Sequence, residues 1–170
     1  MTGRRLRAGL AALAVVVLLA GCGSGKVETD QQKRLDTIAK ATAVYKDPDA
    51  AVAAGYRPVP KCLESDNDTG AMGLTYVNLR LNQDQEINLL RPELLFYQEE
   101  ASGAPPKLAG VGYLVPDDGQ HRPDTPLGHM DGPLPGVGPG QPDRFELHVW
   151  VHRKSPDGPL SIWNKNLKCL

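Results

Sequence analysis

The spacing of apolar residues along the chain changes near its middle. From residue 30 to 45 apolar side chains recur every three or four positions, which predicts an amphipathic helix capped by Asp30. Pro48 is placed to start a second, shorter helix over 50–54, and Gly55 is placed to end it. Prolines then favour extended backbone as far as residue 60.

The second half of the chain has the composition and spacing of β-strands. Candidate strands lie at 74–79, 94–98, 108–115, 145–152 and 160–163. The segment 99–107 contains Ser-Gly and Pro-Pro pairs, so 94–98 and 108–115 are expected to form an antiparallel hairpin. Helices followed by strands joined through turns indicate an α+β fold with a mainly antiparallel sheet.

A long Pro/Gly-rich segment separates the last strands from the others. Residues 116–142 contain seven prolines and six glycines, a density that no helix or central strand tolerates. A loop of this length in a compact domain is usually functional or disordered. It also contains His121 and His129, so it is a candidate for part of a binding site.

The amino terminus has the three parts of a signal peptide. Three arginines precede an apolar run of 13 residues from Ala8 to Ala20, which is too short to span a bilayer as a helix. The sequence Leu19-Ala20-Gly21-Cys22 resembles the lipobox of bacterial lipoproteins, and that resemblance implies cleavage before Cys22 and lipidation of its sulfur. An ordinary secretory signal is the alternative.

These features divide the chain into three parts. We expect a signal peptide at 1–21, a lipidated Cys22 with a flexible tether at 22–29, and a single globular domain at 30–170. The domain would be exported and anchored to the membrane surface by its lipid, and the Arg- and Ala-rich leader favours the outer face of the plasma membrane.

Export bears on the remaining cysteines. Only Cys62 and Cys169 remain once Cys22 is lipidated, and disulfides persist outside the cytoplasm. Two cysteines in such a domain most simply pair with each other. The alternative is a redox-active or metal-binding thiol, and the chain has no Cys-x-x-Cys motif to favour it.

The charge of the mature chain excludes one class of partner. Removing the three arginines of the leader leaves 16 basic against 20 acidic residues, a net charge of −4. A mildly acidic domain has no electrostatic reason to bind nucleic acid or anionic lipid, so its membrane link is the lipid anchor alone. An envelope protein remains a candidate partner.

All four histidines lie between residues 121 and 152, which suggests a metal site. On a strand, Glu146, His148, Trp150 and His152 share one face. Glu146 and His148 are close enough to converge with His129 and Met130 from the loop, a set suited to zinc or copper. The alternative is that His148 is a hydrogen-bonded sheet residue and the loop histidines are solvated.

The motifs of common enzyme families are missing. The chain has no Gly-x-Ser-x-Gly, phosphate-binding loop, His-Glu-x-x-His or dinucleotide fingerprint. Asp66-Asn67-Asp68 does not continue with the spacing of a calcium loop. The sequence therefore favours a protein that is not an enzyme, with a small Ser–His hydrolase as an open alternative.

The chain from Tyr45 to Cys169 resembles a family of uncharacterised exported bacterial lipoproteins. The resemblance rests on the order of several short motifs: Ala53-Ala54-Gly55-Tyr56, Met72-Gly73-Leu74-Thr75-Tyr76-Val77-Asn78, Arg91-Pro92-Glu93-Leu94-Leu95-Phe96-Tyr97, Asp131-Gly132-Pro133, Glu146-Leu147-His148-Val149-Trp150 and Trp163-Asn164 to Cys169. It supports the Cys62–Cys169 pairing and singles out His148. The relatives have a histidine where this chain has Thr75, and the resemblance implies no known activity.

The sequence thus predicts an envelope lipoprotein with three functional alternatives. The first is a noncatalytic domain that binds a ligand or metal, the second a protein-interaction module, and the third a small hydrolase. A bound metal would favour the first, an exposed apolar patch around Trp150 and Trp163 the second, and a serine beside His148 in a deep pocket the third.

Overall fold

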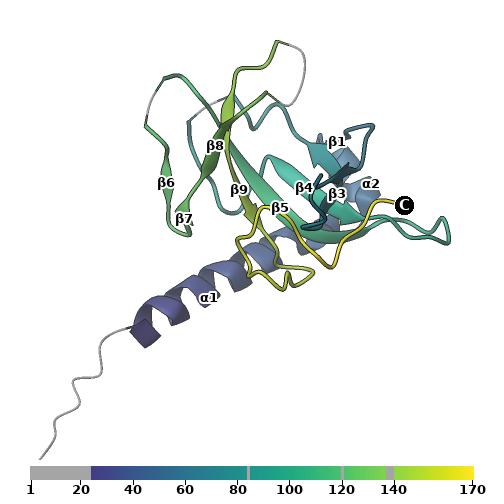
Figure 1. The fold of residues 1–170 in the computed structure, drawn as a ribbon, viewed down its shortest axis with the longest axis horizontal. Helices are drawn as coiled ribbons and strands as arrows, with labels where there is room; N and C mark the ends of the chain where they lie inside the picture. The colour runs from purple at the N-terminus through teal and green to yellow at the C-terminus, as the bar shows by residue number, and fades with distance from the viewer. Residues whose placement is uncertain (1–23, 84, 120, 137–139) are drawn as a thin grey trace, which may run out of the picture.

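A computed structural model describes residues 24–83, 85–119, 121–136 and 140–170. The predicted signal peptide and Cys22 lie outside these residues. Within them the fold is α+β and mostly β, as predicted, with helices first and a mainly antiparallel sheet after them. Figure 1 shows the first helix along one side of the sheet, its initial turns extending away from the strands. No helix in this part of the chain is both long and apolar enough to cross a bilayer.

The helical region begins earlier than the sequence suggests. Helix α1 spans Ser24–Thr42 and continues into a 3₁₀ turn, η1 (Ala43–Lys46). It starts at Ser24 rather than at Asp30, so residues 24–29, which we expected to be a flexible tether, belong to the helix. No proline or glycine from Lys26 onward interrupts the backbone hydrogen bonds of this stretch, so the helix continues toward the leader.

Helix α2 (Pro48–Ala53) was expected at 50–54; it begins at Pro48 and ends just before Gly55, the two residues predicted to start and end it. The Asp47 carboxylate accepts a hydrogen bond from the Asp49 amide at 3.0 Å, which satisfies one free N–H at the start of the helix. Gly55 ends the helical region with φ of +102°, a backbone conformation that other residues rarely adopt.

The strands form one large sheet and one small one. They are β1 (Arg57–Pro58), β2 (Leu63–Glu64), β3 (Ala71–Val77), β4 (Leu94–Gln98), β5 (Lys107–Pro116), β6 (Asp124–Thr125), β7 (Gly128–His129), β8 (Asp131–Leu134) and β9 (Arg144–Val149). The large sheet has the order β1-β3-β4-β5-β9-β8, β2 pairs with β3, and β6 pairs with β7 separately. The predicted hairpin is confirmed as β4 and β5.

The predicted strand at 160–163 is wrong. The chain after β9 turns at Ser155-Pro156-Asp157-Gly158, and the Trp150 amide bonds to the carbonyl of Pro159 rather than to a partner strand. An isolated bridge between Asn164 and Ala71 follows this stretch, which forms no ladder with a strand in the described structure. Pro159 has no amide hydrogen to donate, which disfavours a return strand here.

The Pro/Gly-rich segment contains short strands in its described part. These are β6, β7 and β8, and β8 is the edge of the large sheet. Pro133 lies in β8, where an edge position does not require an amide hydrogen on both sides. The Gly132–Pro133 peptide bond is cis.

Apolar side chains cover both faces of the sheet. On one face α1 and α2 pack through Leu35, Ile38 and Ala51 against strands β4, β5 and β9. On the opposite face a smaller core contains Ala71, Leu94, Phe96, Ala109, Leu114, Trp150 and Leu167. All five residues of β4 are therefore buried, because neither of its faces meets solvent.

The C-terminal segment is fastened across this second face. Cys62 and Cys169 form a disulfide with a Cα–Cα distance of 5.7 Å, which confirms the predicted pairing. Gln98 of β4 donates to the Lys168 carbonyl at 2.9 Å and accepts from its amide at 3.1 Å. These bonds hold the end of the chain over the sheet and enclose the second face from one side.

Candidate functional site

The second face of the sheet presents polar side chains along β9. Glu146 and His148 point to this face with Trp150, as the alternation predicts, and they are almost completely buried. The neighbouring strand β5 has glycine at the facing positions. A Cβ atom on Gly110 would lie 2.6 Å from the Trp150 ring, and one on Gly112 would lie 2.9 Å from Phe96, so aromatic rings lie directly on the β5 backbone.

Arg144, Glu146 and His148 form a continuous polar network on this face. Arg144 contacts Glu146 Oε1 through Nε at 2.7 Å and through Nη2 at 2.5 Å. His148 Nε2 contacts Glu146 Oε2 at 3.1 Å, and His148 Nδ1 contacts the Ile162 carbonyl at 2.7 Å. Both carboxylate oxygens of Glu146 and both ring nitrogens of His148 are therefore engaged.

The hydrogen-bond partners hold the His148 ring from both sides. A carbonyl oxygen can only accept, so Nδ1 donates to Ile162. Nε2 faces Glu146 Oε2, which fixes the orientation of the ring toward the carboxylate.

The pKa of Glu146 supports its ionised form. Burial by itself would raise this pKa, but the hydrogen bond and charge of His148, together with those of Arg144, outweigh burial. The resulting pKa lies below the ordinary value of a glutamate. The Glu146 carboxylate therefore lies between Arg144 and His148, and both side chains contact it.

A cavity of about 240 Å³ lies beside this network. Its walls are mostly apolar: Val59, Leu63, Met72, Val77, Leu94 and Phe96, with Gly136. The polar side chains that line it are Thr75, Arg144 and Glu146. We call it the Thr75–Glu146 cavity. β3, β4 and β9 form its floor, and residues around β1 and β2 cover it.

Thr75 is the unusual residue of this cavity. Its side chain is buried, with 5% exposed, and its hydroxyl has no hydrogen-bond partner in the described structure. A buried hydroxyl without a partner costs about 1–3 kcal/mol relative to one that is bonded. The other such atom among the described residues, Asn82 Oδ1, is not part of this cavity.

The four predicted metal ligands do not come together. Glu146 and His148 are adjacent, but Met130 is buried in the core on the helix side of the sheet. His129 is exposed and pairs with Asp124. Among the described residues no three His, Cys, Asp or Glu side chains are grouped to hold a metal ion. The alternation of side chains along β9 correctly predicted that Glu146 and His148 lie together. His129 lies apart from them because it belongs to β7, which pairs with β6 outside the large sheet.

His152 does not share the face of His148, contrary to the prediction. β9 ends at Val149, so the strand alternation no longer applies at residue 152. His152 Nε2 instead lies 2.9 Å from the hydroxyl of Thr42 at the end of α1. Burial, with a smaller effect from the nearby charge of Lys46, lowers the pKa of His152 to about 4. His121 is exposed.

Trp150 and His148 bear on the other two functional alternatives. Trp150 is 2% exposed and its Nε1 donates to the Ser161 carbonyl at 2.6 Å, so it does not form an exposed apolar patch. The ring nitrogens of His148 contact Ile162 and Glu146 rather than a serine hydroxyl. His148 is therefore not placed to act as the base of a serine hydrolase.

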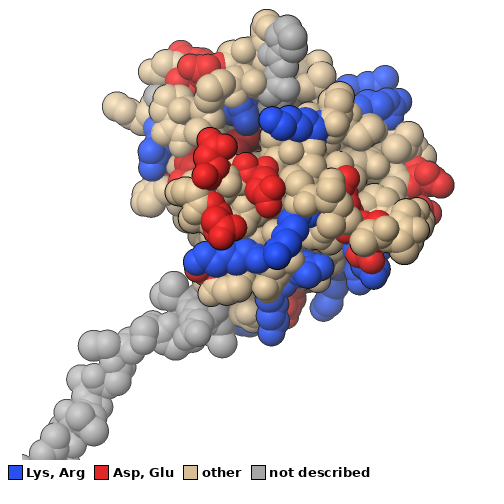
Figure 2. All heavy atoms as spheres, turned by 45° about the vertical axis from the view of Figure 1, so that its right-hand side comes forward, with Lys and Arg blue, Asp and Glu red and all other residues tan. Residues whose placement is uncertain are grey.

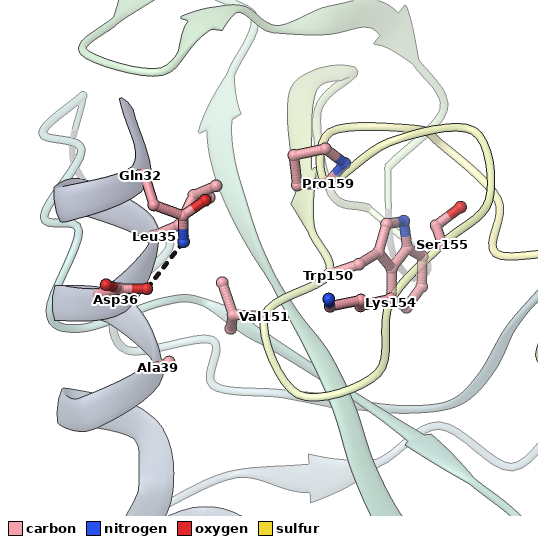
Figure 3. Close-up of a pocket in the computed structure, with 9 residues that line it drawn as sticks. All are labelled: Gln32, Leu35, Asp36, Ala39, Trp150, Val151, Lys154, Ser155 and Pro159. Atoms are coloured by element: carbon pink, nitrogen blue, oxygen red, sulfur yellow. Dashed lines mark hydrogen bonds between the residues drawn. The ribbon is translucent and has the colours of Figure 1, made fainter. Parts of the chain in front are cut away.

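A second hollow, of about 250 Å³, lies between α1 and the chain after β9 (Figure 3). Its residues are Gln32, Leu35, Asp36, Ala39, Trp150, Val151, Lys154, Ser155 and Pro159. Gln32 donates to Asp36 across its edge at 2.8 Å. None of these side chains has a buried polar atom without a partner. This hollow is therefore weaker evidence for a bound ligand than the Thr75–Glu146 cavity is.

Charged side chains of both signs are exposed on the surface. Figure 2 shows Lys and Arg beside Asp and Glu on the face it draws, with no field of one sign.

Sequence reasoning identified half of the polar site. Glu146 and His148 were predicted to converge, whereas Arg144 and Thr75 were not assigned to the site. Arg144 lies two residues before Glu146, so strand alternation could have found it. Thr75 was marked only as a difference from the resembling family, since the register that brings β3 beside β4 is a tertiary property.

Comparisons with known proteins identify no relative of the chain. No protein-family model matches it, and neither a curated protein nor a solved structure gives a significant match. The class that fold and site define is therefore a disulfide-linked α+β domain with a small, mostly apolar cavity.

Proposed function

We propose that the protein is a lipid-anchored protein of the cell envelope whose exported domain binds a small molecule without chemical conversion. The Thr75–Glu146 cavity is the binding site. The leader and Cys22 support the anchor, and the cavity with its unpartnered Thr75 hydroxyl supports ligand binding. We further propose that the long Pro/Gly-rich loop forms part of the rim, because Gly136 lines the cavity.

One observation supports binding above the others. The cavity combines an apolar wall with a buried hydroxyl that has no partner among the described residues. Ligand sites in proteins usually have this composition, with apolar walls and a few placed polar groups. A ligand with one polar group would restore the missing hydrogen bond and remove apolar surface from water.

The size of the cavity limits the ligand. A cavity of roughly 150 Å³ accommodates benzene, so about 240 Å³ accommodates a molecule of about ten heavy atoms. This is below the usual range of drug-sized sites, about 300–1,000 Å³. The ligand is therefore a small metabolite or a fragment of a larger amphiphile.

Fluorescence titration with 2-naphthol tests this proposal. The probe is neutral and has about the size that the cavity accommodates. The mature protein in nanodiscs should increase the probe's emission saturably, and Val59→Trp, which fills the cavity from its cover, should abolish the increase. Val44→Trp, at an exposed position outside the cavity, is the matched control and should bind as the wild type does. Equal signals from wild type and Val59→Trp would exclude the cavity as a binding site.

A further inference from the structure

We infer that the natural ligand of the Thr75–Glu146 cavity is a small monocarboxylate: an apolar body of about eight carbons with a single carboxylate head. This inference rests on the proposed function and specifies its ligand. An apolar chain of this size occurs in free acids and in esterified lipids. We infer the free acid, because an ester has no carboxylate.

The hydrogen-bonding capacity of the lining residues gives the first argument. Glu146 contributes the carboxylate oxygens of the lining, and both are occupied by Arg144 and His148. The Thr75 hydroxyl has a hydrogen to donate and no partner among the described residues. Arg144 uses Nε and Nη2 for Glu146, so its third nitrogen takes no part in that pair. The cavity therefore offers donors and requires a ligand that supplies acceptors.

Arg144 gives the second argument. Its guanidinium bears a positive charge, lines the cavity and binds Glu146 through two of its three nitrogens. Asp131 of β8 lies opposite Glu146 in the register, but it is partly exposed and does not line the cavity. A carboxylate suits the charge and the planar fork of the Arg144 guanidinium as the partner of the nitrogen that Glu146 does not use.

The apolar wall gives the third argument. Val77 and Leu94 on the floor and Leu63 on the cover leave room for an aliphatic or aromatic body and offer it no hydrogen bonds. A polyhydroxylated anion such as a sugar acid would leave its hydroxyls without partners there. An inorganic anion would leave most of the apolar volume unfilled.

A charge series of matched ligands tests the inference. Octanoate, octan-1-ol, octylamine and methyl octanoate have similar bodies and different heads. Each is titrated into the mature protein in nanodiscs, with Val59→Trp nanodiscs as the background for lipid partitioning. We expect octanoate to bind at least tenfold more tightly than octan-1-ol and methyl octanoate, and octylamine not to bind measurably.

Two variants test the residues. Thr75→Val should weaken octanoate binding at least tenfold and weaken 2-naphthol binding less, because 2-naphthol has no carboxylate. Arg144→Lys, which keeps the charge and loses the planar fork, should also weaken octanoate, with circular dichroism to confirm folding. Thr42→Val, whose hydroxyl is buried outside the cavity, should not alter octanoate affinity.

The outcomes separate the inference from the proposed function. Equal affinity for octanoate and octan-1-ol would overturn the carboxylate head and leave a neutral small-molecule site. Tighter binding of methyl octanoate than of octanoate would overturn the free acid in favour of an esterified chain. Failure of every ligand, including 2-naphthol, would overturn the binding function itself.

Discussion

Two buried threonines differ in whether their hydroxyl groups are hydrogen-bonded. Thr75 faces the cavity with no partner, whereas Thr42 donates to the Ile38 carbonyl at 2.8 Å and contacts His152. A protein selected only for stability would not retain a buried hydroxyl without a partner. Stability lost at a binding site is a common consequence of function.

Replacing each threonine by valine gives opposite expectations. Thr75→Val removes a hydroxyl that makes no bond, so the free energy of unfolding without ligand should rise by about 1 kcal/mol. Thr42→Val removes a bonded hydroxyl and leaves His152 Nε2 without its partner, so the free energy should fall by about 1–2 kcal/mol. Urea denaturation measures both. A loss of stability at Thr75→Val equal to that at Thr42→Val would contradict the unpartnered hydroxyl.

His152 makes stability depend on pH. Its pKa is lowered from 6.5 to about 4 in the folded protein, so between these values the unfolded chain binds the proton more readily. The free energy of unfolding should therefore keep its full value above pH 6.5 and fall as the pH drops towards 4, by about 1 kcal/mol once solvent screening of this partly exposed group is allowed for.

The comparison variant is His152→Gln, whose amide can still donate to Thr42 and does not titrate. Urea denaturation at several pH values from 7 to 4 should show a shallower loss of stability for this variant than for the wild type. Contributions from Glu146 are common to both proteins and cancel in the difference. His129→Gln, at an exposed position, should keep the wild-type slope, and identical slopes for all three proteins would show that His152 is not the cause.

At the scale of elements, the cover of the cavity depends on the Cys62–Cys169 bond. Cys62 precedes β2, whose Leu63 lines the cavity, and Cys169 lies at the end of the C-terminal segment. The bond joins residues separated by 107 positions, so it restricts the unfolded chain strongly. The disulfide thus ties β2, which covers the cavity, to the C-terminal segment, which crosses the second face of the sheet.

Removing this disulfide should affect stability and ligand binding together. Cys62→Ser with Cys169→Ser should lower the free energy of unfolding by about 4–5 kcal/mol in the loop-entropy model, measured by urea denaturation. 2-Naphthol binding should weaken as well, because Leu63 is no longer tied to the C-terminal segment. A double variant within about 1 kcal/mol of the wild type would show that packing alone fixes the cover.

The elements were more predictable than their arrangement. The β4 boundaries and the ends of α2 follow from local signals: residue type, a proline and a glycine. The segment 160–163 depends on what it packs against, which a single sequence does not show. The cavity was unpredictable for the same reason, since Thr75 and Glu146 are 71 positions apart and meet only through the order of β3, β4, β5 and β9.

For the whole molecule, the proposed anchor would keep the domain that contains the cavity close to the membrane. α1 begins two residues after Cys22 and spans 19 residues, or about 28 Å. A lipid on Cys22 would therefore keep the domain within a few nanometres of the bilayer, where small amphiphiles such as monocarboxylates concentrate. A short connection suits a protein that receives its ligand from the membrane surface.

Mass spectrometry of the mature amino terminus tests the anchor. The wild-type chain should begin at Cys22, lack residues 1–21 and have the added mass of a diacylglyceryl group and an amide-linked acyl chain, because the lipobox places the thiol at the cleavage site. Several acyl chains bind a membrane stably, so the protein should remain in the membrane fraction after a high-salt wash. Cys22→Ala should have no lipid mass, and the Cys62→Ser, Cys169→Ser double variant should keep it. A mature chain cleaved elsewhere, with Cys22 as a free thiol or absent, would identify an ordinary secretory signal, and the domain would then be released from the membrane that we propose as the source of its ligand.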